Sequence, residues 1–516
     1  MHRFLEKWAD RTPDALALVE HGGGTSYREL NGRANQFAHL LGDCGVARGD
    51  RVVLALDNGR DLVAAYFGTL KAGAVAVPLP AGPRSDRLRP AIDGCEPRVA
   101  VVDGSTARAA ATDGPVARVP HVFVAQPSHR RNEVPLPFRD LTDAMAASPS
   151  HPVEATAGDD DLAAIIYTSG STGEPRGVML SHRNFVANAQ SIVSYLGLTA
   201  ADRVMCVLPF YYVYGLSLLH THVVVGGSVV IENRSAFPNV VLQGMREYEV
   251  TGFAGVPSTF SLMLHRSSLA EADLPALRYV TQAGGAMPPA RIAEWLDRGP
   301  RADFFVMYGA TEAAARLTYL PPEDLRRKPG SIGRAIPGVE IQVITESGAV
   351  AGPDEVGELV ARGANISSGY WRDAEETARR FSAHGYHTGD LGYRDAEGYF
   401  HLVGRRHDMI KVGANRVGVK EIEDVLNEHP AVHEAAVVGV AHDMLGEAPV
   451  AFVALREPLS DVENTLRAFG AARLAAYKVP VRVITIPELP KLPGAGKLDR
   501  ASLRALAAEM RFEVAS

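Results

Sequence analysis

Residues 161–182 read DLAAIIYTSGSTGEPRGVMLSH, an apolar run that leads into a loop of hydroxyl and glycine residues. The run at 162–167 is rich in β-forming residues and short, which predicts a buried strand. Small side chains let the backbone approach a ligand, and turned N–H groups with hydroxyls suit phosphate oxygens. Apolar residues at helical spacing over 185–196 predict a helix after the loop. Strand, loop and helix together predict an anion site on an α/β sheet.

Two common phosphate-binding patterns do not fit this loop. Pro175 stands where G-x-x-x-x-G-K-[ST] needs its second glycine, and G-x-G-x-x-G does not occur here. A flexible Ser/Thr/Gly linker is the alternative interpretation. The strand and the amphipathic helix that hold its two ends argue against a linker.

The stretch resembles the phosphate loop of the adenylate-forming (ANL) superfamily. This superfamily comprises acyl- and aryl-CoA synthetases, stand-alone acyl-AMP ligases and the adenylation domains of peptide synthetases. The family usually has Lys where this chain has Arg176, so a planar fork replaces a point charge. The resemblance implies that the loop wraps the β- and γ-phosphates of ATP through Thr168, Ser169, Gly170, Ser171, Thr172 and Gly173.

Length, charge and cysteine content exclude several classes of protein. A chain of 516 residues exceeds one ordinary domain. Its net charge of −7, without a basic run, argues against a nucleic-acid partner. Three widely spaced cysteines exclude a disulfide framework and favour a cytoplasmic location. The N-terminus lacks a signal-peptide core, and the most apolar run, at 223–231, is too short for membrane insertion.

Short apolar strands alternate with helical patterns through the first 320 residues. This alternation predicts an α/β fold whose large N-terminal domain contains helix-covered, largely parallel sheets. Residues 126–160 are rich in proline and polar residues, which predicts a surface loop. The strands are expected at 51–56, 74–79, 203–208, 228–231, 251–255, 277–281 and 304–307.

Unusual residues follow the carboxyl ends of the later strands, where ligands of parallel sheets bind. We therefore expect these residues to gather on one rim. The segment 284–286 resembles the family segment that packs against adenine and substrate, so Gly285 and Ala286 are expected at ATP. No Asp or Glu occurs between Arg203 and Ile231, which favours an acid without an amino group, because an unpaired buried ammonium is costly. The acid pocket is expected to include Tyr211, Tyr212, Tyr214, Gly215, Val256, Gly284, Gly285 and Ala310.

Residues 308–312, Tyr-Gly-Ala-Thr-Glu, resemble the family motif Y-G-x-T-E. The resemblance implies that Tyr308 and Gly309 contact ATP, that Thr311 lies near the α-phosphate and that Glu312 holds Mg²⁺. A carboxylate oxygen is the hard ligand that Mg²⁺ prefers. An ordinary helix start is the alternative, because Thr-Glu suits a first turn.

Residues 385–404 read as a hairpin that turns at 395–398. Just inside it, Thr-Gly-Asp resembles the family motif whose carboxylate, here Asp390, accepts both ribose hydroxyls. Arg405 would be the second ribose contact. A zinc site is the alternative for this histidine-rich region, but no cysteine or H-E-x-x-H accompanies His384, His387, His401 and His407.

We expect two domains, 1–406 for ATP and acid and 407–516 as a small, mobile α+β lid. The family hinge, usually Asp or Lys, aligns with His407. By resemblance, Lys411 enters the site for the second half-reaction while Gly413 and Ala414 form a pantetheine tunnel. Lys497, in a glycine loop, aligns with the catalytic lysine.

The resemblance implies an ATP-dependent acid–thiol ligase. Lys497, Glu312, Thr311, Arg176 and Lys411 are its candidate catalytic residues, and ATP, Mg²⁺ and CoA or a carrier-protein phosphopantetheine are its cofactors and acceptor. An amino-acid adenylation enzyme that loads a carrier protein is the alternative. A non-catalytic nucleotide-binding module is a third interpretation, disfavoured because Lys497, Glu312, Asp390 and Arg405 are all present.

Overall fold

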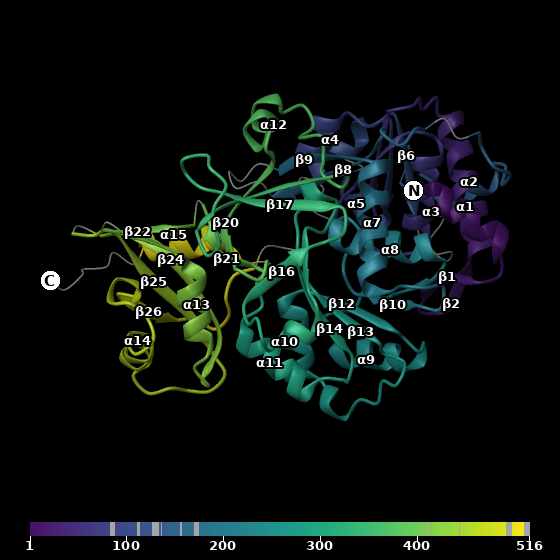
Figure 1. The fold of residues 1–516 in the computed structure, drawn as a ribbon. Helices are drawn as coiled ribbons and strands as arrows, with labels where there is room; N and C mark the ends of the chain where they lie inside the picture. The colour runs from purple at the N-terminus through teal and green to yellow at the C-terminus, as the bar shows by residue number, and fades with distance from the viewer. Residues whose placement is uncertain are drawn as a thin grey trace.

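The computed structural model describes residues 1–82, 88–110, 114–125, 134–135, 137–154, 157–169, 175–406, 408–413, 415–442, 444–491 and 498–509. A large N-terminal part and a smaller C-terminal part stand side by side (Figure 1). The predicted α/β class with two unequal domains is confirmed.

The first sheet has the order β7-β6-β5-β3-β4-β8-β9. Its neighbours pair in parallel except β8 and β9, which form an antiparallel hairpin. Central strands such as β3 are apolar and buried after their first residue, Arg51, because helices cover both faces. The strands are β3 (Arg51–Ala55), β4 (Val75–Pro78), β5 (Val99–Asp103), β6 (His121–Ala125), β7 (Arg139–Asp140), β8 (Leu162–Ser169) and β9 (Pro175–Ser181).

Two details of the expected pattern are wrong. A second strand, β9, stands between the predicted loop and the helix α7 (His182–Leu196), because Val178 and Leu180 alternate into the core with period two. The predicted surface loop at 126–160 contains β7 and the helix α6 (Leu141–Ala146), whose Leu141 and Met145 are buried.

The second sheet is mixed, with the order β17-β18-β20-β21-β16-β15-β14-β13-β12-β10-β11-β1-β2 and β19 beside β20. Strands β10 to β14 and β1 pair in parallel, as predicted for this region, whereas the strands from β15 onward and β2 are antiparallel. Their bounds are β1 (Leu16–Glu20), β2 (Gly23–Ser26), β10 (Arg203–Cys206), β11 (Ser228–Ile231), β12 (Gly252–Gly255), β13 (Tyr279–Gln282), β14 (Asp303–Tyr308), β15 (Thr318–Leu320), β16 (Ser331–Ala335), β17 (Val339–Ile344), β18 (Gly357–Gly363), β19 (Phe381–Ser382), β20 (Gly385–Arg394) and β21 (Phe400–Arg405).

One large apolar core joins both sheets through helices that lie between them. Helix α8 is almost entirely buried, consistent with its lack of a polar face. A capping box between Ser26 and Glu29 begins α2. The helices of this part are α1 (His2–Arg11), α2 (Tyr27–Asp43), α3 (Arg60–Lys71), α4 (Arg89–Cys95), α5 (Gly104–Ala110), α8 (Val213–Val225), α9 (Pro238–Glu247), α10 (Pro257–Arg266), α11 (Pro289–Arg298) and α12 (Ala374–Arg380), with α6 and α7 above.

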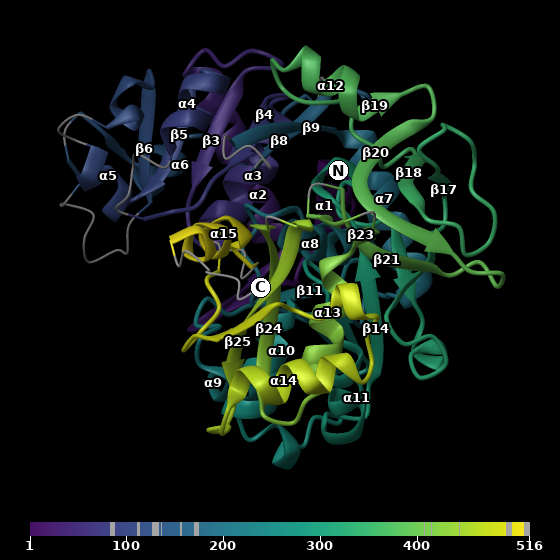
Figure 2. The ribbon, with the colours of Figure 1, turned by 90° about the vertical axis from the view of Figure 1, so that its left-hand side faces the viewer.

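The C-terminal part has a sheet of order β23-β22-β25-β24, with β26 beside β25. It faces the viewer in Figure 2 and contacts the larger part where Arg291 Nη2 of α11 donates to the His433 carbonyl oxygen at 3.1 Å. Its elements are β22 (Ile410–Val412), β23 (Asn415–Val417), α13 (Val419–Asn427), β24 (Val432–His442), β25 (Gly446–Leu455), α14 (Val462–Ala471), β26 (Arg482–Thr485) and α15 (Arg500–Glu509). The boundary at 406/407 stays a prediction, and His407 lies outside the described residues. Among the described helices, none is long and apolar enough to cross a bilayer.

Candidate active site

The predicted nucleotide contacts Tyr308, Asp390 and Arg405 lie together. Antiparallel pairing of β20 with β21 sets Asp390 opposite Arg405, and the Arg405 Nε lies 3.2 Å from Asp390 Oδ1. From the end of β14, the Tyr308 hydroxyl donates to Asp390 Oδ2 at 2.5 Å. Burial, with the facing carboxylate, raises the pKa of the Tyr308 phenol well above its usual value, so it stays a neutral donor. A partly exposed carboxylate held in this way can accept hydroxyl groups of a ligand.

Glu312 lies in a short 3₁₀ turn directly after this strand. The Tyr370 hydroxyl donates to its Oε1 at 2.7 Å, and the Ser367 backbone N–H donates to its carbonyl oxygen at 2.7 Å. Its Oε2 accepts no hydrogen bond from a described residue. A fixed carboxylate with a free oxygen fits Mg²⁺, which takes oxygen ligands and keeps several waters.

Gly309 allows the turn between Tyr308 and Glu312 to pack tightly. A Cβ at this position would lie 1.8 Å from the Ala315 carbonyl oxygen. Real Cβ atoms do not approach a backbone oxygen so closely, so only glycine fits.

The expected acid pocket is assembled from the ends of three neighbouring strands. The Tyr214 hydroxyl of α8 donates to the Thr281 carbonyl oxygen at 2.9 Å. Gly284 has a φ of 83°, and a Cβ there would lie 3.0 Å from Val256 Cγ1 and 3.9 Å from the Tyr214 ring. The predicted convergence of these three on one rim is therefore observed, while their role in binding an acid stays a prediction.

The other residues expected in the acid pocket and at adenine lie next to α8, after β13 and after β14. The Tyr211 and Tyr212 rings lie 4.5 Å apart ahead of α8, and burial raises the pKa of Tyr211. The Gln282 amide donates to the Gly285 carbonyl oxygen at 2.8 Å and fixes the glycine segment. Gly215 lies in the first turn of α8, Ala286 follows Gly285, and Ala310 and Thr311 lead into the turn of Glu312.

Arg176 is ion-paired with the beginning of α12. Its guanidinium lies 3.5 Å from Asp373 and 3.3 Å from Glu376, and its side chain is 20% exposed. On the neighbouring strand, Thr168 pairs with Arg176 in the hairpin register. The phosphate contact of Arg176 stays a prediction, because this cation already has two carboxylate partners.

Lys411 and Gly413 are the predicted site residues of the C-terminal part that the structure describes. Lys411 on β22 is exposed, and its backbone N–H donates to Glu447 at 2.7 Å. A Cβ on Gly413 would meet no atom within 4 Å, so the side of this turn is open. Outside the description are Gly170, Ser171, Thr172, Gly173, Ala414 and Lys497, together with the side chain of Ser169.

A family model described as AMP-binding enzyme matches residues 5–371, and the model of its C-terminal domain matches residues 421–497. The chain belongs to the AMP-binding enzyme family. The adenylate-forming superfamily predicted from its motifs is therefore confirmed.

Similar AMP-binding enzymes cover almost the whole chain. An oxalate–CoA ligase of Arabidopsis thaliana is 29% identical over 96% of this chain and 96% of its own length. An indoleacetate–CoA ligase of Aromatoleum aromaticum is 30% identical over 98% of this chain and 99% of its own length. The crystal structure of the anthranilate CoA ligase AuaEII with anthranoyl-AMP has a TM-score of 0.90, 27% identity and coverage of 99% and 97%. Family and relatives together indicate an AMP-forming CoA ligase.

The sequence pattern did not reveal two residues that contact the predicted site residues of this AMP-binding enzyme. Tyr370, which holds Glu312, lies 58 residues farther along the chain. Arg316, which covers the Tyr214 ring, follows the Y-G-x-T-E segment without belonging to it. No local pattern distinguishes either residue, because their partners come from other strands and helices.

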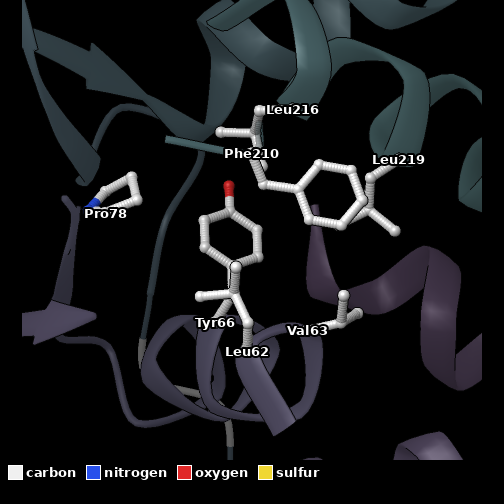
Figure 3. A pocket seen from close by; sticks show the side chains of 7 residues that line it. All are labelled: Leu62, Val63, Tyr66, Pro78, Phe210, Leu216 and Leu219. Carbon is white, nitrogen blue, oxygen red and sulfur yellow. The ribbon is translucent and has the colours of Figure 1, made fainter. Parts of the chain in front are cut away.

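A small apolar cavity lies between α3 and α8 (Figure 3). Its volume is about 10 Å³, which is the space of a single water and too small for a substrate. The Tyr66 hydroxyl, which points into it, is hydrogen-bonded to His220 Nε2 at 2.8 Å. No group of three His, Cys, Asp or Glu within the described chain is arranged to hold a metal.

Proposed function

We propose that this AMP-binding enzyme joins a carboxylic acid to AMP and transfers the acyl group to the pantetheine thiol of CoA. The observation that carries the proposal is the convergence of Tyr308, Asp390 and Arg405 beside the turn of Glu312. These residues lie on different strands and would hold the ribose and the phosphates of one ATP.

The first half-reaction forms an acyl-adenylate. An oxygen of the substrate carboxylate attacks the α-phosphorus, the bond to the β-phosphate oxygen breaks, and pyrophosphate leaves. Two anions must meet, so positioned positive charge and hydrogen-bond donors supply most of the catalysis. Lys497 would bridge the carboxylate and the α-phosphate, and Asp390 would fix the ribose.

Glu312 would hold Mg²⁺, which neutralises charge on the phosphates when it is bound. The Tyr370 hydroxyl orients the Glu312 carboxylate, because it donates to Glu312 Oε1 and leaves Oε2 for the metal. Thr311 precedes it in the same turn and would face the α-phosphate.

In the second half-reaction the thiol sulfur attacks the carbonyl carbon of the mixed anhydride, and AMP leaves. Lys411 and Gly413 would enter the site for this step and Lys497 for the first. We propose that the C-terminal part rotates between the two poses, with its hinge at His407. CoA is the proposed thiol because relatives of this length are CoA ligases.

A pyrophosphate-exchange screen over fatty, aryl, dicarboxylic and amino acids tests the first half-reaction. Thioester assays with CoA and with a phosphopantetheinylated carrier protein then test the second. Exchange with amino acids alone, followed by loading of the carrier protein, would replace this proposal with amino-acid adenylation.

Two variants separate the half-reactions. Lys497→Ala should abolish exchange yet keep thioester formation from a supplied acyl-adenylate. Gly413→Leu should keep exchange and lose thioester formation. If either variant loses both steps equally while remaining folded, the two-pose mechanism is wrong.

A further inference from the structure

Arg316 is a buried cation whose contacts are all neutral. It is 2% exposed, and its Cζ lies 4.1 Å from the centre of the Tyr214 ring. Its Nε donates to Met307 Sδ at 3.2 Å, and its Nη1 donates to the Ala315 carbonyl oxygen at 3.3 Å. The Tyr195 hydroxyl is a further neutral neighbour. A guanidinium has five N–H donors, and none of them is paired with a carboxylate of a described residue.

Other deeply buried charges in the described chain have partners of opposite sign. Lys71 pairs with Glu6, Asp202 with Arg278, Asp324 with Arg327, and Glu376 with Arg379. Arg316 forms no ion pair with a described residue. Because a buried charge without a counter-charge is costly, the missing partner points to a ligand.

The position of Arg316 is next to the expected acid pocket. A Cβ at Gly309 would lie 2.9 Å from the Arg316 Cα, so the two backbone segments touch. Tyr214, which Arg316 covers, also borders Gly284. The Arg316 backbone therefore lies against the turn of Gly309, and its guanidinium lies over a ring of the expected acid pocket.

The backbone before Arg316 is strained. Ala314 and Ala315 have φ values of 53° and 129°, although neither is glycine. Such conformations are costly for residues that have a Cβ, and they persist where the surrounding structure enforces them. Here they immediately precede Arg316, whose guanidinium lies over the Tyr214 ring.

We propose that Arg316 binds a second carboxylate of the substrate, so that the acid activated by this enzyme is a short dicarboxylic acid. The inference rests on the proposed adenylation reaction. A carboxylate matches the planar guanidinium with two parallel hydrogen bonds and supplies the absent negative charge. A short substrate is proposed because Tyr214, which lies against the guanidinium, is only 8% exposed and is held in place by its hydrogen bond to Thr281.

Pyrophosphate exchange with matched acids tests the assignment. The probes are malonate, succinate and glutarate, each compared with its own monoamide, which keeps the shape and loses one charge. For the wild-type enzyme, kcat/KM for the best diacid should exceed kcat/KM for its monoamide by about 100-fold. This is the scale of losing a hydrogen-bonded contact to a charged group. In Arg316→Met the preference should fall below about 5-fold, mainly through KM, with the KM for ATP unchanged. Arg316→Lys should lie between the two.

A matched control is Arg334→Met, which removes an exposed arginine that covers the Tyr399 ring at 4.1 Å and should leave the preference unchanged. Thermal unfolding should show Arg316→Met at least as stable as the wild type, because an unpaired buried charge is removed. Equal loss of exchange with both members of each pair, with a lower melting temperature, would show a structural arginine and overturn the assignment. Exchange with fatty or aryl monoacids but with no diacid would overturn it while leaving the proposed function intact. If no acid supports exchange, both the role of Arg316 and the proposed adenylation reaction are wrong.

Discussion

The hydrogen bond between Tyr308 and Asp390 gives a direct test of the nucleotide site. The donor Tyr308 is half-buried, the acceptor Asp390 is a carboxylate 14% exposed, and the two oxygens lie 2.5 Å apart. A hydrogen bond to a charged group contributes about 1.5–3 kcal/mol. The other contact of the carboxylate, Arg405, is 59% exposed and cannot compensate, because solvent screens it.

Tyr308→Phe should therefore raise the KM for ATP by about 10- to 100-fold, at roughly 1.4 kcal/mol per tenfold. The free energy of unfolding should fall by about 1.5–3 kcal/mol. Exchange kinetics at varied ATP, run well below the melting temperature, measure the first effect, and denaturant unfolding measures the second.

Tyr393→Phe is the matched control. Tyr393 lies on β20, the strand of Asp390, but its ring stacks on His401. This variant should leave the KM for ATP unchanged. A Tyr308→Phe variant that is destabilised but keeps the wild-type KM for ATP would show that this hydrogen bond does not belong to the nucleotide site.

Three further changes test separate parts of the structure. Tyr370→Phe removes the donor to Glu312 and should raise the Mg²⁺ concentration for half-maximal exchange by about 10-fold; an unchanged Mg²⁺ titration would contradict this. Burial lowers the pKa of His222 to about 4, so the unfolded state binds more protons between pH 6.5 and 4. Lowering the pH from 7 to 5 should therefore cost about 2 kcal/mol of stability at this residue, and His222→Gln should show a flatter pH dependence. Gly309→Ala should destabilise by about 3 kcal/mol or more through its backbone clash, whereas Gly42→Ala, on the exposed side of α2, should stabilise by about 0.5–1 kcal/mol in the same unfolding assay.

Strands and helices with a strong period were predictable along the chain. Residues such as Val229 and Phe253 lie in fully buried strands, and continuous apolar runs indicate such strands directly. The strand β9 was missed because its alternation is short and adjoins a glycine-rich loop. Helix α6 was missed because its buried residues are few within a proline-rich segment.

Contacts between residues far apart in the sequence were predictable only where both residues belong to family motifs. Asp390 and Arg405 were expected together, and the hairpin register sets them opposite each other. Tyr370 beside Glu312, and the two carboxylates beside Arg176, belong to no motif. Their contacts depend on how β9, α12 and the turn after β14 pack, which no local pattern encodes.

By itself the sequence determined the α/β class, the adenylate-forming family and the set of polar residues at the strand ends, because these depend on periodicity and on motifs of adjacent residues. Only the tertiary structure decided which of those residues meet and which charges remain without a partner. Arg316 is the clearest case. An arginine in a sequence is ordinarily solvated, and only its burial against Tyr214, away from any described carboxylate, turns it into a candidate determinant of substrate choice.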